Sequence, residues 1–438
     1  MDVCADAVSL ARLQRDGLAW AITAEAVDLG SDPSVWFERE AGRGRVLGWM
    51  RDGWMVAAGE AFTATADGPG RIVALARAAA RLEGRCVVDA PPGAGDLPRL
   101  VLSLAFADTV EGPAWAGIPA ARLVLPRRAW LRRQDGSTWC VRAAAVTTAD
   151  TPADVHARLL ADPPICPLRP AEPWDPITEG YADLVADAAA LIGDGALRKV
   201  VLARAVDEPC RVDPATLIRR LRAASDPDAL VYAVDLPDGA CFLGATPEVL
   251  FAADGCEVST MALAGSRRRE DDPAADAAVC EALFASTKDR KEHQLVVEHI
   301  TAVLNARGAQ TIVPPSPHVR TLPRLHHLET ILHSTLREDE PLELLGALHP
   351  TPAVCGLPVP AARSYILRRE HLHRGLYAGA LGFIDRERAR FWVPLRGGIF
   401  RGDRCRLFAG AGIVETSDPQ SELAETETKL SVMRSVIV

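Results

Sequence analysis

The first feature of this sequence that could do chemistry is a lysine at the head of an apolar run. Lys199 is followed by Val-Val-Leu-Ala, and this pattern predicts a strand that carries one ammonium group into or beside a core. Because burying a charge is costly, such a lysine lies either at a strand end in water or in a polar site built to receive it. The residue alone favours the strand end, so the choice depends on the acids and glycines that follow.

Two pairs of acids recur at helical spacing. Glu422 and Glu425 lie three residues apart, with Lys429 four residues further on, and Asp289 and Glu292 repeat the spacing of three. Offsets of three and four place side chains on one face of a helix. Each pair alone is compatible with a solvated charged surface. Together, two such helices could converge on a hard divalent cation such as Mg2+, which takes oxygen ligands.

Several smaller signals could supply the rest of a ligand site. Glu248 follows a short apolar strand and would project from its edge. Arg396 lies in an apolar segment before two glycines, where a guanidinium needs an anion such as a substrate carboxylate. Tyr377 could add a hydroxyl donor. The small-residue runs at 263–266 and 409–412 could let backbone N–H groups approach a carboxylate, or could only allow tight sheet packing.

The elements that must position these residues are predicted from periodicity and turn signals. Helices are expected at 75–82, 181–192, 274–306 with a break near 286, and 418–435, and strands at 101–107, 122–125, 199–204, 230–234, 241–243, 249–252, 376–384, 390–400 and 405–414. A strand pair is expected around the turn at Asp52-Gly53. Six prolines between Asp162 and Pro176 indicate either an interdomain linker or a rigid loop crossing one domain.

Composition excludes several classes of function. The 438 residues are 48% apolar and carry 49 basic against 58 acidic residues, a net charge of −9 that argues against nonspecific nucleic-acid binding. We see no signal peptide and no apolar run of membrane-spanning length. Ten scattered cysteines without a Cys-x-x-Cys pair indicate a reduced, cytoplasmic protein, and the histidines lack cysteine partners at zinc-ligand spacing.

Eight motifs in sequence order resemble the chorismate-utilising enzymes, and most closely their isochorismate synthase branch. The resemblance spans about Trp174 to Ser435 and implies one α+β domain, 1–438, of two stacked, largely antiparallel sheets with helices on the outside. Residues 1–160 would then be a variable N-terminal part and 174–438 the catalytic part. The motifs are Lys-Val-Val-Leu-Ala-Arg (199), Gly-Ala-Thr-Pro-Glu (244), Leu-Ala-Gly-Ser (263), Lys-Asp-Arg-x-Glu-His (288), His-Pro-Thr-Pro-Ala (349), Tyr-Ala-Gly-Ala (377), Gly-Ala-Gly-Ile-Val (410) and Glu-x-x-Glu-x-x-x-Lys (422).

The resemblance also implies a reaction: water adds at C2 of chorismate while the C4 hydroxyl leaves. Lys199 would be the base for the water and Glu248 the acid for the hydroxyl. A neutral lysine and a protonated glutamate both demand desolvation. Mg2+ would be held by Glu292 and Glu425, with Asp289 and Glu422 as nearby acids. Eight residues would contact the substrate: Gly265, Ser266, His327, Ala353, Tyr377, Arg396, Gly410 and Lys429.

Single residues distinguish the branches of the family. Anthranilate synthases usually lack the lysine at position 199, because they use ammonia from a partner subunit. Aminodeoxychorismate synthases carry a lysine where this chain has Ala264. Salicylate synthases keep both Lys199 and Glu248 but tend to carry threonine at the position of Ala353, so alanine there points to release of isochorismate. Cys355, in place of a common glycine, departs from the family pattern, as does Leu423 in place of an aromatic residue.

We therefore expect a Mg2+-dependent isochorismate synthase that acts on chorismate as a monomer, without a glutaminase subunit, nucleic acid or membrane as partner. The main alternative is a salicylate synthase, which goes on to eliminate pyruvate. An amine-adding synthase component and a catalytically silent chorismate-binding protein are further alternatives. The silent protein is expected to lack at least one member of a set that this chain keeps complete: Lys199, Glu248, Glu292 and Glu425.

Overall fold

The computed structural model describes residues 19–91, 93–94, 100–177, 179–308, 310–338, 340–386 and 388–438. Its helices are α2 (Ser34–Arg39), α3 (Arg71–Glu83), η1 (Pro113–Trp115), α4 (Pro152–Leu160), α5 (Tyr181–Gly193), α6 (Pro214–Ala224), α7 (Pro273–Ala285), α8 (Thr287–Ala306), α9 (Pro341–Leu348), α10 (Val359–Arg369) and α11 (Pro419–Ile437). No helix within the described ranges has the length and apolarity needed to cross a membrane.

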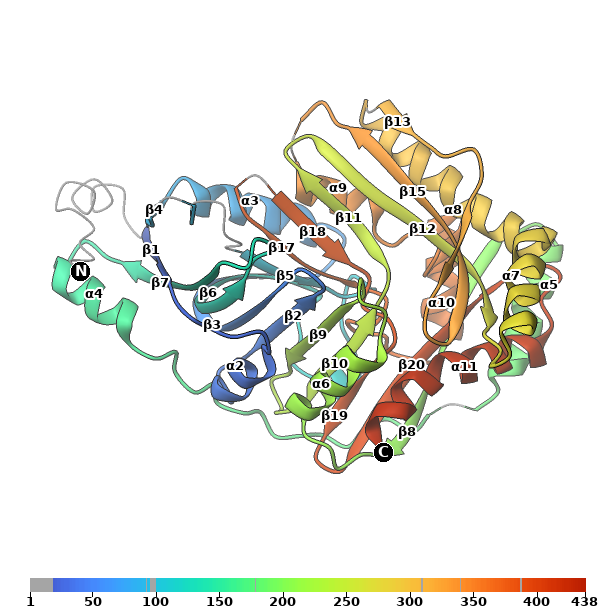
Figure 1. Ribbon diagram of the computed structural model, residues 1–438, viewed down its shortest axis with the longest axis horizontal. Helices are drawn as coiled ribbons and strands as arrows, with labels where there is room; N and C mark the ends of the chain where they lie inside the picture. Colours follow the sequence, from blue (N-terminus) through green and yellow to red (C-terminus); the bar gives the residue numbers. More distant parts are fainter. Residues whose placement is uncertain are drawn as a thin grey trace.

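The strands are numbered in the order in which they occur along the chain, and Figure 1 uses these labels. They are β1 (Ala19–Ala26), β2 (Val46–Met50), β3 (Gly53–Ala66), β4 (Cys86–Asp89), β5 (Leu100–Leu104), β6 (Ala121–Arg132), β7 (Thr138–Val146), β8 (Lys199–Pro209), β9 (Leu230–Asp235), β10 (Cys241–Thr246), β11 (Val249–Asp254), β12 (Glu257–Arg268), β13 (Gln310–Ile312), β14 (His318–Thr321), β15 (Leu325–Thr335), β16 (Gly356–Leu357), β17 (Ala380–Ile384), β18 (Arg388–Trp392), β19 (Gly397–Arg401) and β20 (Arg404–Ile413).

The strands form one hydrogen-bonded network that divides at β6 into two long arms and a short branch, β7–β1–β4. One arm runs β6–β3–β2–β9–β10–β19–β20–β8–β16. The other runs β6–β5–β17–β18–β11–β12–β15, with β13 and β14 on the far side of β15. Among the described strands, β1 and β4 pair in parallel, and the pairings within both arms are antiparallel. The chain crosses from the first arm to the second at the β10–β11 turn.

Two helices carry acids to the junction of the arms. In Figure 1, α8 and α11 lie beside the two arms, and α8 packs on β12 while α11 packs on β20. Both helices begin at side-chain caps: Ser286 accepts from the Asp289 N–H, and Asp418 accepts from the Ser421 N–H, with Pro419 following. The predicted break near Ser286 and the predicted start at Asp418-Pro419 are therefore confirmed.

One sequence prediction about the strands is wrong at an important point. The expected strand over 390–400 is two strands, β18 and β19, and Arg396 lies in the turn between them with a left-handed φ of 48°. The expected strand over 376–384 likewise begins only at Ala380, after a turn in which Ala378 has φ 57°. Non-glycine residues in this region of the backbone are held there by their surroundings and cluster at functional sites.

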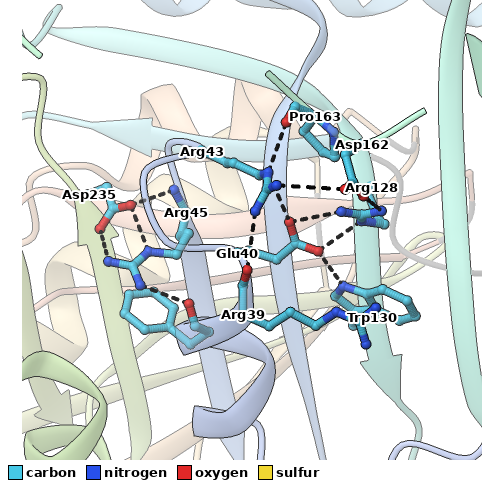
Figure 2. A network of polar contacts seen from close by, with 10 residues as sticks. Arg39, Glu40, Arg43, Arg45, Arg128, Trp130, Asp162, Pro163 and Asp235 are labelled. Carbon is cyan, nitrogen blue, oxygen red and sulfur yellow. Dashed lines mark hydrogen bonds and ion pairs between the residues drawn. The ribbon is translucent and has the colours of Figure 1, made fainter. Parts of the chain in front are cut away.

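Strands from the first 160 residues pair with strands from the rest of the chain: β2 with β9 and β5 with β17. Figure 2 shows a second connection: Arg45 donates to the carboxylate of Asp235, at the end of β9, at 2.8 and 3.0 Å. In the same network Glu40, at the end of α2, accepts hydrogen bonds from Arg128 (2.8 and 3.0 Å) and Trp130 (2.8 Å) of β6, and Arg128 also pairs with Asp162 at 2.6 Å. We infer that the chain folds as one domain and that the segment 162–176 crosses within it.

The Glu40→Ala variant tests this inference. The free energy of unfolding is expected to fall by about 3–5 kcal/mol, because the buried guanidinium of Arg128 loses its main partner. Urea unfolding followed by tryptophan fluorescence should show one transition that shifts as a whole. A second transition left in place would mean that 174–438 unfolds separately. As a control, removing the exposed Glu25, which pairs with Arg142, should change stability by less than about 1 kcal/mol.

Candidate active site

A cavity of about 60 Å3 lies where the two arms meet α8 and α11. We call it the central cavity. Among the residues that line it, those predicted from the sequence are Glu248, Gly265, Ser266, Glu292, His327, Ala353, Tyr377, Arg396, Gly410, Glu425 and Lys429. Lys199 lies just behind this lining, in contact with Glu292. Asp289 and Glu422 are buried on the same helices as the two lining glutamates but are not part of the wall.

Lys199 begins β8 as predicted, but its side chain is 0% exposed, so a strand end in water is the wrong interpretation. Its Nζ lies 2.9 Å from Oε1 of Glu292, an ion-pair distance, without the geometry of a hydrogen bond to any described atom. Gly412 makes room for this contact. A Cβ at position 412 would lie 2.3 Å from Oε1 of Glu292 and 3.0 Å from Cε of Lys199. The amine of Lys199 therefore lies in the interior with one carboxylate beside it.

Glu248 lies in the turn that joins the two arms and is 4% exposed. The turn is fixed on both sides: the Glu248 N–H donates to Oγ1 of Thr246 (3.2 Å), and the Glu248 carbonyl accepts from the Val393 N–H (3.1 Å). Burial raises the pKa of the Glu248 carboxyl to about 7, against the opposing charges of Arg396 and Lys199. Near neutral pH this group is therefore protonated in a substantial fraction of molecules, as a proton donor must be.

His327 is held as a neutral ring by its neighbours. Its Nε2 lies 3.3 Å from Nη2 of Arg396, and because a guanidinium only donates, Nε2 must accept. The ring proton is then on Nδ1, which lies 3.2 Å from the Gly265 carbonyl and 3.0 Å from Oγ of Ser266. Burial and the charge of Arg396 lower the pKa of His327 well below its ordinary value. Arg396 is thus the cation of this pair.

The strained turn that presents Arg396 is fixed from below by a buried tyrosine. The hydroxyl of Tyr232 donates to the Leu395 carbonyl at 3.0 Å. Gly244 and Gly397 leave room for it, because a Cβ at either position would lie 2.5 or 2.2 Å from that hydroxyl oxygen. Above the turn, burial raises the pKa of Tyr377 to about 12, so its phenol keeps its proton and can donate to an anion.

The two predicted acid pairs meet where α8 and α11 approach each other. Glu292 and Glu425 both line the central cavity. Lys288 of α8 lies 2.8 Å from Glu422 of α11. Burial, followed by the neighbouring charge of Glu425, raises the pKa of Glu422. Carboxylates from both helices are thus concentrated at and just behind the wall of the cavity.

Each of these acids has a cationic partner. The pairs are Glu292 with Lys199 (2.9 Å), Asp289 with Arg267 (2.9 Å), Glu422 with Lys288 (2.8 Å) and Glu425 with Lys429 (2.6 Å). Within the ranges that the structure describes, no three His, Cys, Asp or Glu side chains form a ready cation cluster. The donor set still fits a hard cation, because two carboxylates face one cavity and Mg2+ commonly takes its other ligands from water and substrate.

Two residues of the site were not singled out from the sequence. Gly412, which makes room for the Lys199–Glu292 contact, lies within a motif but carried no role of its own. Arg374 lines the central cavity and is 4% exposed. The argument used for Arg396 could not have found it, because Arg374 follows the polar run Arg-Arg-Glu-His-Leu-His at 368–373, where an arginine is expected at the surface. Gly410 lines the cavity, and its carbonyl accepts from Nζ of Lys429 at 2.7 Å; donation by its N–H to a substrate carboxylate stays a prediction.

The raised pKa of Glu248 predicts a pH-dependent gain in stability for Glu248→Gln. Between its unfolded value of 4.5 and its folded value of about 7, the folded wild type binds the proton more tightly than the unfolded chain. The wild type therefore loses stability as pH rises through this window, whereas the amide does not. Urea unfolding at about pH 8 should show a gain of about 3 kcal/mol for the variant, and at about pH 4 almost none.

A matched control is Glu298→Gln, which alters an exposed carboxylate of α8. Its effect on the free energy of unfolding should stay nearly constant over the same pH range. If Glu248→Gln also gives a constant difference between about pH 4 and pH 8, the raised pKa of Glu248 is contradicted.

Known proteins resemble this chain in sequence. It is 41% identical over 260 residues to the isochorismate synthase EntC of Escherichia coli (strain K12), covering 58% of this chain and 66% of EntC. It is 42% identical over 256 residues to a salicylate biosynthesis isochorismate synthase of Pseudomonas aeruginosa, covering 58% of this chain and 53% of that protein. The matches thus span less than two thirds of either relative.

Solved structures confirm the predicted α+β fold. MenF, the menaquinone-specific isochorismate synthase from Escherichia coli, matches 98% of this chain and 99% of its own with a TM-score of 0.77 at 27% identity. Anthranilate synthase component I from Streptococcus pneumoniae matches 87% of this chain and 92% of its own, with a TM-score of 0.68 at 19% identity, and so shares the fold. The family described as chorismate binding enzyme matches residues 21–438. The chain therefore belongs to the chorismate-binding enzyme family.

Proposed function

We propose that this protein is an isochorismate synthase, which converts chorismate to isochorismate by adding water at C2 and releasing the C4 hydroxyl. The observation that carries the proposal is the burial of Lys199 and Glu248 at one cavity, with the pKa of Glu248 raised to about 7. A reaction that takes one proton from water and gives one to a leaving hydroxyl needs two such groups. The isochorismate synthases among its relatives support the same reading.

In this proposal each group has one role. Glu248, protonated because it is buried, gives its proton to the departing C4 oxygen. Lys199 takes a proton from the water that attacks C2, and the two groups exchange roles in the reverse direction. Arg396 and Tyr377 hold the enolpyruvyl carboxylate of the substrate, since a guanidinium and a phenol both donate to an anion. His327, kept neutral, fixes the position of Arg396 without adding a second charge.

The cation side of the site would receive the other carboxylate of the substrate. Glu292 and Glu425 are the residues that would hold Mg2+, with Asp289 and Glu422 near its waters. When bound, the ion would neutralise the ring carboxylate of chorismate and hold it in place. The contacts of Glu292 with Lys199 and of Glu425 with Lys429 support this assignment, because each carboxylate already lies beside a basic side chain.

Substrate entry requires movement of side chains. The central cavity measures about 60 Å3, far below the roughly 300 Å3 of small-molecule pockets. Side chains that line it are paired with one another, Lys429 with Glu425 and Arg396 with the neutral His327. In the proposal, the cation replaces Lys429 as the partner of Glu425, and Arg396 keeps its contact with His327 and gains the substrate carboxylate as a further partner.

Product analysis tests the reaction. Incubation with chorismate and Mg2+, followed by chromatography, should yield isochorismate, and a chelator should stop its formation. Salicylate and pyruvate without isochorismate would instead assign the chain to the salicylate synthases, despite the alanine at position 353. An aminated product formed only with ammonia would assign it to the amine-adding synthases.

Replacing Lys199 by alanine is expected to lower turnover by about 10²- to 10⁴-fold, because the attacking water loses its base. Chorismate should still bind, since the groups that hold its carboxylates remain, and calorimetry with Mg2+ present measures this directly. The exposed Lys291 of α8 is the control, and Lys291→Ala should keep the wild-type rate. Turnover of Lys199→Ala within a few-fold of the wild type would remove Lys199 from the base role.

A further inference from the structure

Near Lys199, one edge of β8 pairs first with the short strand β16. Where β16 ends, side chains take over the hydrogen bonds to the backbone of β8. β16 has two residues, which pair with Lys199 and Val200. Beyond them, the β8 edge continues with the Val201 carbonyl and the Ala203 N–H. The first accepts from Nη2 of Arg374 at 2.8 Å, and the second donates to Oε2 of Glu370 at 2.9 Å. Buried backbone groups need such partners.

Arg374 joins this edge to other segments. Its Nε donates to Oε1 of Glu370 at 2.7 Å, and its Nη1 donates to the Val354 carbonyl at 2.9 Å, beside Ala353 of the central cavity. Its Cζ lies 4.3 Å from the ring centroid of Phe106, on the N-terminal part of the chain. The side chains of Glu370 and Arg374 are 1% and 3% exposed. Through these hydrogen bonds, the planar guanidinium of Arg374 fixes β8, the segment of Val354 and its own loop relative to one another.

The loop that carries Arg374 also carries Tyr377 and rests on the N-terminal part. The indole N–H of Trp115 donates to the His373 carbonyl at 2.8 Å, and the Phe106 N–H donates to the Gly375 carbonyl at 2.9 Å. Gly375 is pressed against the indole, because a Cβ there would lie 2.1 Å from a ring carbon of Trp115. The contacts of Trp115 and Phe106 with this loop, which we call the loop support, therefore hold both the Glu370–Arg374 ion pair and the Tyr377 turn.

We propose that Glu370 and Arg374 form a positioning pair, which holds the strand of Lys199 at a fixed distance from the Ala353 segment and the Tyr377 turn. The role for catalysis rests on the proposed function, whereas the bracing of β8 does not. Neither residue has to touch the reacting atoms. Their effect is on geometry, to which transfer of a proton between two fixed groups and a water is sensitive.

Arg374→Lys is the primary test. An ammonium keeps the charge but cannot bridge Glu370 and two carbonyls at once. We expect kcat to fall by about 10- to 100-fold, while KM for chorismate changes by less than about 3-fold, because the turn of Arg396, the charged partner of its carboxylate, keeps its own support from Tyr232. The neighbouring Arg369 is the matched control, since it pairs with Asp187 at the exposed surface, and Arg369→Lys should leave both constants unchanged.

Hydrogen exchange gives a readout that does not depend on the reaction. The Ala203 amide is protected through Glu370, so Arg374→Lys should speed its exchange while amides paired between β8 and β20 stay protected. Unchanged exchange at Ala203 would overturn the bracing of β8. Faster exchange at Ala203 in Arg374→Lys, with kcat unchanged, would show that Glu370 and Arg374 stabilise the structure without a role in catalysis. Faster exchange in a protein that forms no isochorismate would uphold the bracing and reject the proposed function instead.

A second variant covers the case in which Arg374→Lys does not fold. Trp115→Phe removes the hydrogen bond to the His373 carbonyl but fills most of the same space. It should lower kcat by several-fold with a smaller change in KM, together with faster exchange of the loop amides around Gly375. A wild-type kcat together with faster hydrogen exchange of the loop amides would contradict a positioning role for the loop support.

Discussion

The structure depends on keeping the amine of a lysine inside the protein. Lys199 is completely buried and has Glu292 beside it, and taking a lysine and a carboxylate out of water costs free energy unless geometry and neighbours compensate. That requirement explains the glycine at position 412, which leaves the space for contact. It also explains why the first turns of α8 bury the acids Asp289 and Glu292, whereas the following turns bury apolar residues. The chain gives up stability here to keep a reactive amine away from bulk water.

The free-energy cost of burying polar and charged groups recurs around the central cavity, and these buried groups are the ones that give the site its chemistry. Glu248 is protonated near neutrality because it is buried, and Arg396 is held in a left-handed turn by the Tyr232 hydroxyl below it. Each feature destabilises the folded state by itself. Together they give an acid, a cation and a lysine around one small, buried space, where electrostatic interactions are stronger than in water. The two sheet arms and two helices are needed because no single element could position all of these groups.

Local signals in the sequence predicted much of this, and long-range packing accounts for the rest. The starts of α8 and α11 could be predicted because a capping side chain and a proline act within one turn. The motifs identified nearly all the residues of the cavity. The burial of Lys199 could not be read locally, since it depends on Glu292 and Gly412 far along the chain. The turn at Arg396 was predicted as strand for the same reason, because Tyr232 holds it from another strand.

Infrared spectroscopy of Glu248 tests the central claim most directly, because a protonated carboxyl has a carbonyl band that a carboxylate lacks. The difference spectrum between the wild type and Glu248→Gln isolates this one group. The account predicts a protonated-carboxyl band that is present at pH 5 and disappears with a midpoint at about pH 7. A band that has already disappeared by pH 5 would show an ordinary, ionised glutamate and would contradict the account of burial as the source of the acid.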